Sequence, residues 1–263
     1  MSTVSIPATT TTARTAPAWS GLRRLTRVEL RKMVDTRAGL VLAAISLLLV
    51  LLPIVTDLWR TARSKNTFTS LIGDSLGGLV LLMPILGVLL VTSEWSQRTA
   101  PATFTLVPNR GRLVAAKGLA ALLFGTAIGV FSLVTAALAF TVGGLLHRTG
   151  GSWSISPWLV PFLFLWLYVV ILQGAAIGLL IRNSALAITT FLLLPTVWTV
   201  VANVTPGLKG AAAWVDLHTA LVSVTDVDRM TGADGAHIGT ALLLWLVLPT
   251  AGGVLRLVRT DVA

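Results

Sequence analysis

The sequence predicts an all-α membrane protein with six transmembrane helices, preceded by a cytoplasmic amphipathic interface helix. The 263 residues are 55% hydrophobic and only 11% charged, whereas about a quarter of the residues of a soluble domain are charged. The mean hydropathy of the chain is +0.86. Its apolar runs also approach, one after another, the roughly 20 residues that a helix needs to cross the hydrocarbon core of a bilayer.

The first 37 residues divide into a predicted tail and a predicted helix. Residues 1–18 are rich in Ser, Thr, Ala and Pro, which is typical of a disordered tail. Residues 19–37 form an amphipathic pattern with helical spacing, whose apolar face holds Trp19, Leu22, Leu30, Met33 and Val34. A basic stripe lies beside this face and consists of Arg24, Arg27 and Arg31. We expect such a helix to lie in the cytoplasmic interface of the membrane, and the pattern leaves open whether it also contacts a protein partner.

The rest of the chain, residues 38–263, is predicted to be a six-span transmembrane domain. The six apolar runs are 38–57, 77–92, 113–146, 158–181, 184–204 and 237–255. The second run is short unless it begins near Leu71, and the third is long enough to project into the cytoplasm. Two pairs of glycines spaced four residues apart, Gly125 with Gly129 and Gly174 with Gly178, predict close helix packing on the third and fourth spans.

The distribution of charge gives the direction of the spans, because cytoplasmic loops of membrane proteins carry an excess of Lys and Arg. With the N-terminus in the cytoplasm, 14 of the 20 basic residues lie in cytoplasmic segments and 6 in outer ones. The sequence therefore predicts a multi-pass protein with both termini in the cytoplasm. This bias also accounts for the formal net charge of +10, so the basic composition does not indicate a nucleic-acid partner.

Several kinds of chemistry are disfavoured by what the sequence lacks. The chain has no cysteine and three scattered histidines, which argues against thiol chemistry and against a zinc site. No ionisable side chain lies near the middle of a predicted span, which disfavours a proton-coupled carrier or an intramembrane enzyme. The outer loop 205–236 contains an acidic run from Asp226 to Asp234, but Met230 and Thr231 break the pattern of a calcium loop. We therefore expect no metal site.

The cytoplasmic loop 93–117 is the most polar break in the apolar sequence. Glu94 and Arg98 have the spacing and order of a helical ion pair, and Pro108 with Asn109 predicts a tight turn before the third span. From the residues alone, a solvated connector explains this loop at least as well as a docking surface or a catalytic loop does.

The loop resembles a known family. The pattern of Glu94, Arg98-Thr99, Leu106, Pro108, Arg110 and Lys117 is similar to the first cytoplasmic loop of type-2 ABC exporter permeases, the transmembrane subunits of bacterial ABC transporters. Glu29, Lys32 and Arg37 resemble the elbow helix of that family, and the six-span layout extends the resemblance over the whole chain. The chain departs from the family pattern at Arg98, where Gly is frequent, and at Asn109, where a small residue is usual.

The resemblance implies a coupling helix that seats on a separate nucleotide-binding ATPase subunit. Its contacts would be Glu94 and Arg98, supported by Thr99, Pro108, Arg110 and Arg112. The elbow-helix positions Glu29 and Lys32 would belong to the interface helix. The chain contains no GxxxxGK[ST] phosphate loop, so it is not expected to be an ATPase itself. ATP and Mg would be held by the partner subunit.

The resemblance further implies a second permease chain, as a homodimer or heterodimer, in a bacterial plasma membrane. A substrate path between the two chains would be lined by the second and fifth spans, and the residues predicted to face it are Met83, Phe191, Trp198 and Asn203. The function expected is ATP-driven export of a hydrophobic or amphipathic substrate. The alternative is a membrane immunity or scaffold subunit that binds a partner through the same loop and transports nothing.

Overall fold

The computed structural model describes residues 18–61, 65–97, 109–150, 153, 155–208, 211, 214–222 and 231–259. The regular secondary structure of these residues is entirely helical, and six of the described helices are long and apolar enough to cross a membrane. The all-α, six-span class predicted from the sequence is confirmed. Of the predicted tail, residues 1–17 lie outside the described residues.

Helices α1 (Ala18–Asp35) and α2 (Arg37–Arg60) are separated by Thr36. The hydroxyl of Thr36 accepts a hydrogen bond of 3.0 Å from the backbone N–H of Gly39, which satisfies one of the free donors at the start of α2. The amphipathic helix therefore ends two residues earlier than predicted, and the first span begins at Arg37.

The second span is α4 (Leu79–Ser96), and α3 (Phe68–Gly77) precedes it with a break at Gly78. Thr67 and Ser70 form a reciprocal capping box at the start of α3, which stabilises a helix end in polar sequence. The second span thus begins at Leu79, not near Leu71, and ends four residues beyond the predicted run 77–92.

The third and fourth spans are α6 (Arg110–Leu145) and α7 (Leu159–Ile181). Helix α6 has 36 residues and is therefore about 54 Å long at 1.5 Å per residue. The side chain of Asn109 caps α6 by accepting a 3.0 Å hydrogen bond from the backbone N–H of Arg112. Helix α7 ends at Arg182, whose backbone is left-handed with φ 59°.

The fifth span is α8 (Ser184–Val204), and the sixth is a continuous helical stretch with a wide turn inside it. Two short helices, η2 (Pro206–Leu208) and α10 (Leu217–Val222), lie between them in the predicted outer loop. The sixth span joins α11 (Gly232–Leu242), the π-helical turn η4 (Leu243–Val247) and α12 (Leu248–Arg259). Because Thr231 and Asp234 form a capping box, this span begins earlier than the predicted residue 237.

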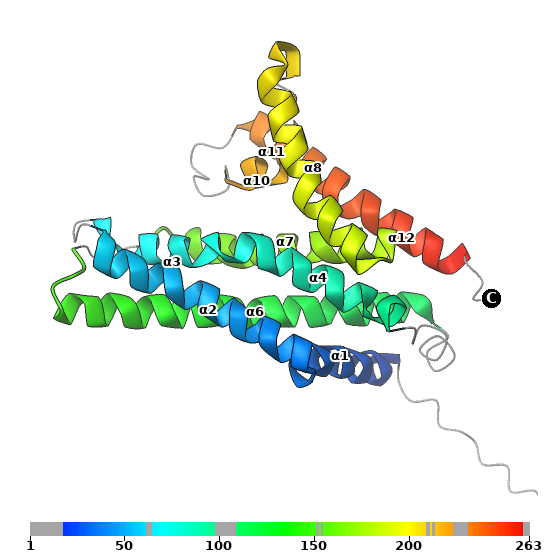
Figure 1. The fold of residues 1–263 in the computed structure, drawn as a ribbon, viewed down its shortest axis with the longest axis horizontal. Coiled ribbons are helices and arrows are strands. Elements are labelled where there is room, and N and C mark those ends of the chain that lie inside the picture. The colour runs from blue at the N-terminus through cyan, green and yellow to red at the C-terminus, as the bar shows by residue number, and fades with distance from the viewer. Residues whose placement is uncertain are drawn as a thin grey trace, which may run out of the picture.

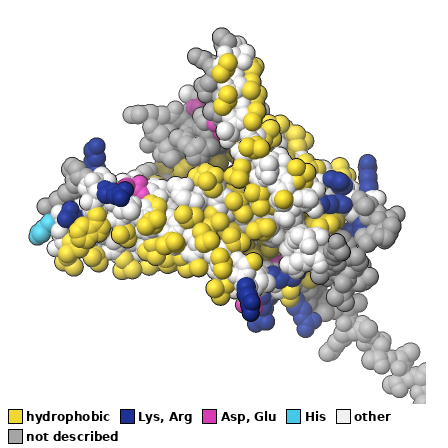
Figure 2. Space-filling model, viewed as in Figure 1, with side chains coloured by type: hydrophobic (Ala, Val, Ile, Leu, Met, Phe, Trp, Pro, Cys, Tyr) yellow, Lys and Arg dark blue, Asp and Glu magenta, His cyan; other side chains and the backbone are white. Residues whose placement is uncertain are grey.

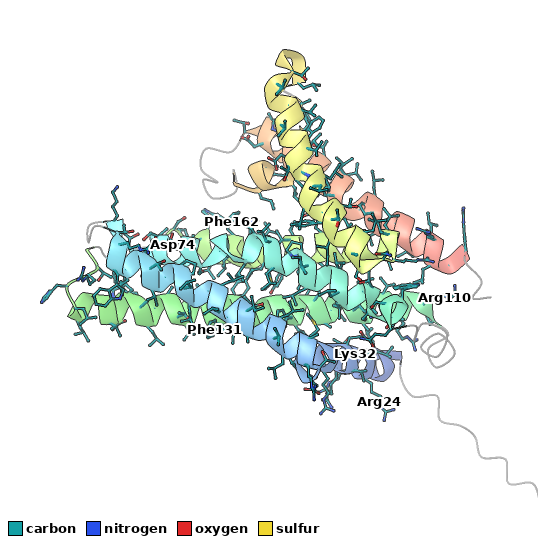
Figure 3. The ribbon with its side chains drawn as sticks, viewed as in Figure 1. Arg24, Lys32, Asp74, Arg110, Phe131 and Phe162 are labelled. Carbon is teal, nitrogen blue, oxygen red and sulfur yellow. The ribbon has the colours of Figure 1, made fainter. Side chains whose placement is uncertain are left out.

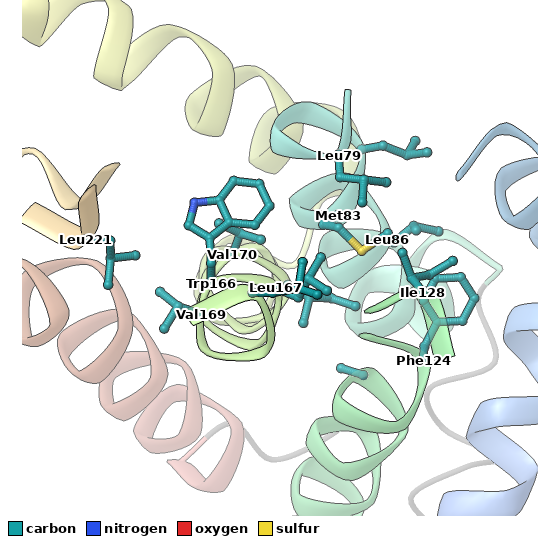
Figure 4. Packing of buried hydrophobic residues seen from close by; sticks show 14 of the residues in the cluster. Leu79, Met83, Leu86, Phe124, Ile128, Trp166, Leu167, Val169, Val170 and Leu221 are labelled. Carbon is teal, nitrogen blue, oxygen red and sulfur yellow. The ribbon is translucent and has the colours of Figure 1, made fainter. Parts of the chain in front are cut away.

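Four of the described helices form a bundle, and α8 projects away from it. In Figure 1, α2, α4, α6 and α7 run side by side, while α8 leaves the bundle at a steep angle and α12 lies near the end of α7. The core is centred where α4, α6 and α7 meet. Figure 4 shows its apolar side chains, among them Leu79 and Met83 of α4, Phe124 of α6, and Trp166 and Leu167 of α7.

Glycines allow the closest helix contact in the bundle, between α4 and α7. A Cβ atom added at Gly174 of α7 would overlap the carbonyl group of Pro84 in α4, and one added at Gly178 would lie 3.1 Å from the Cα of Val88. Close packing on the third span is present as well, because a Cβ at Gly129 would lie 2.6 Å from the ring of Phe164. The glycine spacing therefore predicted the packing correctly on both spans.

The surface divides into an apolar flank and charged ends. Figure 2 shows hydrophobic side chains over the visible flank of the bundle, with Lys and Arg side chains gathered toward its ends. Only 22% of the apolar stretch of α2 and 12% of that of α8 is buried within the chain. An apolar flank between charged ends is the pattern of a bilayer-spanning bundle, so the protein is a multi-pass membrane protein.

A candidate functional site: the charge cluster where α1, α4 and α6 meet

Four charged side chains from three helices meet at one end of the bundle, and we call them the charge cluster: Glu29 and Lys32 of α1, Glu94 of α4 and Lys117 of α6. The ammonium nitrogen of Lys117 lies 2.9 Å from Oε2 of Glu29 and 3.0 Å from Oε1 of Glu94. The ammonium nitrogen of Lys32 lies 2.6 Å from Oε1 of Glu29 and 3.6 Å from Oε1 of Glu94. Lys32 marks this end of the bundle in Figure 3.

Three members of the charge cluster are almost fully buried. Glu29 and Glu94 are each 2% exposed and Lys117 is 4% exposed, whereas the Lys32 side chain is 42% exposed. Removing charges from water is costly unless they are paired and hydrogen-bonded. Here two carboxylates face two ammonium groups, and Lys117 also donates a 2.8 Å hydrogen bond to the backbone carbonyl of Leu90.

The electrostatics of the cluster favour the ionised state of Glu29. Burial acts to raise the pKa of Glu29, but the charges and hydrogen bonds of Lys117 and Lys32 outweigh burial and lower it below its ordinary value of 4.5. Glu29 is therefore a carboxylate at neutral pH. The cluster holds two negative and two positive side chains close together, without a net charge.

The cluster connects the two ends of the loop 93–117, which the charge bias predicts to be cytoplasmic. Glu94 lies in the last turn of α4, just before the loop, and Lys117 lies about two turns into α6. Both bind α1, since Lys117 pairs with Glu29 and Glu94 lies beside Lys32. The two ends of the loop are thus held to each other and to α1.

The structure changes the interpretation of Glu94 as a surface contact. The family resemblance implies that Glu94 touches a partner, but its carboxylate is turned into the molecule and buried against Lys117. Arg98, Thr99 and Pro108 lie outside the described residues. Arg110 and Arg112 are half-buried, and a guanidinium nitrogen of Arg110 donates to the backbone carbonyl of Leu257 in α12.

The burial of side chains on α1 follows the predicted amphipathic pattern in part. Its basic residues Arg24, Arg27 and Arg31 are exposed and Leu22 is half-buried, but Val34, expected on the apolar face, is 39% exposed. Figure 3 shows Arg24 pointing away from the bundle. The side chain of Trp19 lies outside the described residues.

Sequence reasoning missed the cluster as a unit. The family resemblance points to Glu29, Lys32, Glu94 and Lys117 as separate positions of two motifs, and it does not place them together. One signal was present: Lys117 stands between apolar residues, with Leu113 before it and Leu119 after it. A lone lysine in an apolar helix requires a buried counter-charge, and Glu29 and Glu94 are two of the acidic residues on the same predicted side.

A second feature is a pocket of about 190 Å³ between α4, α7, α8, α10 and η4. Phe191 and Trp198, both predicted to face a substrate path, line it together with Gln173. Met83, predicted for the same path, does not line it, because Met83 is fully buried between α4 and α7. The side chain of Asn203 lies outside the described residues.

Comparisons with known proteins and the metal-binding potential of the chain add no further assignment. No protein-family model and no curated protein matches this chain. Within the part of the chain that the structure describes, no group of three or more His, Asp or Glu side chains is arranged to hold a metal ion. Asp226 and Asp228 lie outside that part, and Asp234 caps α11. The charge cluster and the pocket are therefore the basis for a functional argument.

Proposed function

We propose that this chain is the transmembrane permease subunit of an ATP-driven ABC exporter in a bacterial plasma membrane, with both termini in the cytoplasm. A separate ATPase subunit would hold ATP and Mg and seat on the loop between α4 and α6. A second permease chain, identical or related, would complete the substrate path. The observation that carries this proposal is the charge cluster, which joins both ends of that loop to α1 through buried ion pairs.

The cluster suits the transmission of force from a partner. A push on the loop acts on the end of α4 and the start of α6 together, because Lys117 and Glu94 are paired at 3.0 Å. Separating a buried ion pair leaves an uncompensated charge and costs about 3–5 kcal/mol. Helix α1, the end of α4 and the start of α6 are therefore linked as one unit, which would suit the coupling of ATP hydrolysis to a rearrangement of the bundle.

The pocket fits the class of substrate. Its lining is largely apolar and aromatic, with Trp166, Phe191, Trp198 and Trp245 among the residues, and its polar side chains are Gln173, Thr196 and Asp216. An apolar pocket with few polar groups binds hydrophobic or amphipathic molecules. Export of such a substrate is the reaction we propose.

The test uses the chain co-expressed with a candidate ATPase subunit and reconstituted in proteoliposomes. We expect Arg98→Glu to abolish co-purification of the ATPase, because it reverses a proposed contact. We expect the double variant Lys117→Met/Glu94→Gln to retain co-purification and to lose transport, because it cuts the link and leaves Glu29 paired with Lys32. Arg60→Gln, an exposed residue at the other end of α2, is the matched control and should retain both.

Other results would assign a different function. A partner that co-purifies through the loop without any ATP-dependent movement of substrate would support a membrane immunity or scaffold subunit. Transport that a protonophore abolishes and ATP depletion leaves intact would support a proton-coupled carrier. If the Arg98→Glu variant binds the ATPase as strongly as the unchanged chain does, the loop does not form the contact with the ATPase.

A further inference from the structure

The pocket between α4, α7, α8, α10 and η4, which we call the aromatic pocket, has the size and the walls to take an aromatic ring. Its volume is about 190 Å³, and an apolar protein cavity of about 150 Å³ holds benzene. Trp166, Val170 and Gln173 reach its wall from one face of α7, because they are spaced four and three residues apart. Figure 4 shows Trp166 extending from α7 on the side away from Phe124 of α6.

Three polar groups of the aromatic pocket are used within the chain. The hydroxyl of Thr196 donates a 2.9 Å hydrogen bond to the backbone carbonyl of Leu192. The indole N–H of Trp245 donates a 2.6 Å hydrogen bond to the backbone carbonyl of Val215. Asp216 also takes part in an interaction within the chain. We therefore assign these three groups to the wall itself and not to a ligand.

Two further polar groups of the aromatic pocket make no hydrogen bond with the part of the chain that the structure describes. The indole nitrogen of Trp198 is buried and has no partner there. Gln173 is only 6% exposed, and no hydrogen bond of the described residues involves its carboxamide. A buried polar group without a partner costs free energy, so both groups call for a partner from outside the chain.

The chemistry of these two groups defines the partner. An indole N–H can only donate a hydrogen bond, so the group that satisfies Trp198 must be an acceptor. The carboxamide of Gln173 offers two donors and one acceptor. Both groups are uncharged and offer an ionic ligand no counter-charge, and burying a charge without one is costly. The aromatic walls favour a ring that packs against them edge-to-face or offset.

We propose that the aromatic pocket binds a neutral aromatic molecule that carries a ketone, ester or amide oxygen beside its ring. The ring lies among Trp166, Phe191 and Trp245. The oxygen accepts a hydrogen bond from the indole N–H of Trp198, and the carboxamide of Gln173 is the second polar contact. This inference rests on the proposed function only in naming the molecule as the exported substrate, since binding requires neither the ATPase nor ATP.

The test compares two probes of nearly the same shape, para-fluoroacetophenone and para-fluoro-α-methylstyrene. They differ only in the group beside the ring, which is a carbonyl in the first and a carbon–carbon double bond in the second. Fluorine NMR of each probe is recorded with the full-length chain in nanodiscs and with empty nanodiscs, so that partition into lipid is subtracted. We expect the chain to bind the ketone about tenfold more tightly than the alkene, the difference that one net hydrogen bond makes.

Two variants test the polar groups separately. Trp198→Phe keeps a ring and removes the N–H, so we expect it to weaken ketone binding about tenfold and to leave alkene binding unchanged. Gln173→Leu should also weaken ketone binding, while its unfolding temperature stays equal or rises because an unpartnered buried amide is removed. Trp59→Phe, the same change at an exposed tryptophan of α2 outside the pocket, is the matched control and should change neither affinity.

Three results would overturn the proposal. The first is equal affinity of the unchanged chain for the ketone and the alkene. The second is full ketone affinity in both Trp198→Phe and Gln173→Leu, which would remove these groups from the site. The third is tighter binding of the cation para-fluorobenzyltrimethylammonium than of the ketone, which would assign the pocket to positively charged ligands.

The same measurements separate this site from the proposed function. Selective ketone binding by the chain alone, with no ATPase that co-purifies, would support the site and contradict the exporter. ATP-driven export by a chain that binds the ketone and the alkene equally would support the exporter and contradict the site.

Discussion

Lys117 supplies a positive charge beside two buried glutamates at one end of the bundle. Its ammonium group lies within 3.0 Å of both Glu29 and Glu94 and is itself 4% exposed. Bulk water cannot take the place of Lys117 beside Glu29 or Glu94, because each glutamate is only 2% exposed. The effect of removing Lys117 is therefore set by two carboxylates left together and not by the loss of one contact.

We predict that Lys117→Met destabilises the protein by about 3–5 kcal/mol, the usual cost of removing one partner from a buried ion pair. Thermal unfolding in detergent, followed by the loss of helical circular dichroism, measures the change. Lys65→Met removes an exposed lysine from the opposite side of the bundle and should leave the unfolding temperature unchanged. Equal unfolding temperatures for the two variants would show that the cluster contributes no stability.

Acid should weaken the same site through Glu29. The pKa of Glu29 is lower in the folded protein than its ordinary value of 4.5, so its contribution to stability is complete above that value. The contribution is lost as the pH falls through the folded-state pKa, where the folded protein begins to take up the proton. We predict that the unfolding temperature of the unchanged chain falls more steeply below about pH 4.5 than that of Glu29→Gln. Parallel pH profiles would contradict this.

The members of the cluster were visible in the sequence, but their pairing was not. Lys117 and Glu29 are 88 residues apart, and helical periodicity relates only residues within one helix. The spacing of Glu94 and Arg98 predicted a local pair, whereas the structure pairs Glu94 with α6 and α1. The helical spacing therefore predicted an exposed Glu94, whereas contacts between helices distant in sequence bury it.

At the scale of the helices, the α4–α7 contact depends on the absence of side chains. We predict that Gly174→Ala is strongly destabilising, because its methyl group would overlap the carbonyl group of Pro84, a backbone atom that cannot turn away. Gly118→Ala is the matched control, since the same change at that site of α6 meets no atom within 4 Å. It should be neutral or stabilising by up to about 1 kcal/mol, the difference in helix propensity. The yield of folded protein and its unfolding temperature distinguish the two variants.

Hydropathy predicted the existence of the six spans and the start of the fifth at Ser184, but it missed the start of the sixth. The sixth span begins in polar sequence at a capping box formed by Thr231 with Asp234, and α3, before the second span, begins at one formed by Thr67 with Ser70. A cap acts through hydrogen bonds to the first free backbone N–H groups of a helix, and hydropathy does not detect it. The glycine spacing predicted close packing correctly, because it identifies where backbones can approach.

For the whole molecule, the charge bias predicts which end of the bundle faces the cytoplasm. The chain has no cysteine, so single cysteines can be introduced directly. Ser96 and Ser156 are both exposed, the first at the end of α4 and the second just before α7. We predict that a membrane-impermeant thiol reagent labels Ser156→Cys in intact cells and labels Ser96→Cys only after the membrane is permeabilised. The reverse pattern would invert the topology and remove the loop between α4 and α6 from the cytoplasm.

The short connection between the fourth and fifth spans has a consequence for the pocket. Only Arg182 and Asn183 separate α7 from α8, so the start of α8 is tied to the end of α7. Helix α8 has 21 residues, and its far end therefore lies about 30 Å away from this connection. Because α8 is long and its connection to α7 is short, a rotation of α8 by about 10° at this connection would move its far end by about 5 Å. Phe191 and Trp198 lie on α8 and line the pocket. The angle between α7 and α8 at Arg182 and Asn183 therefore affects the width of the pocket.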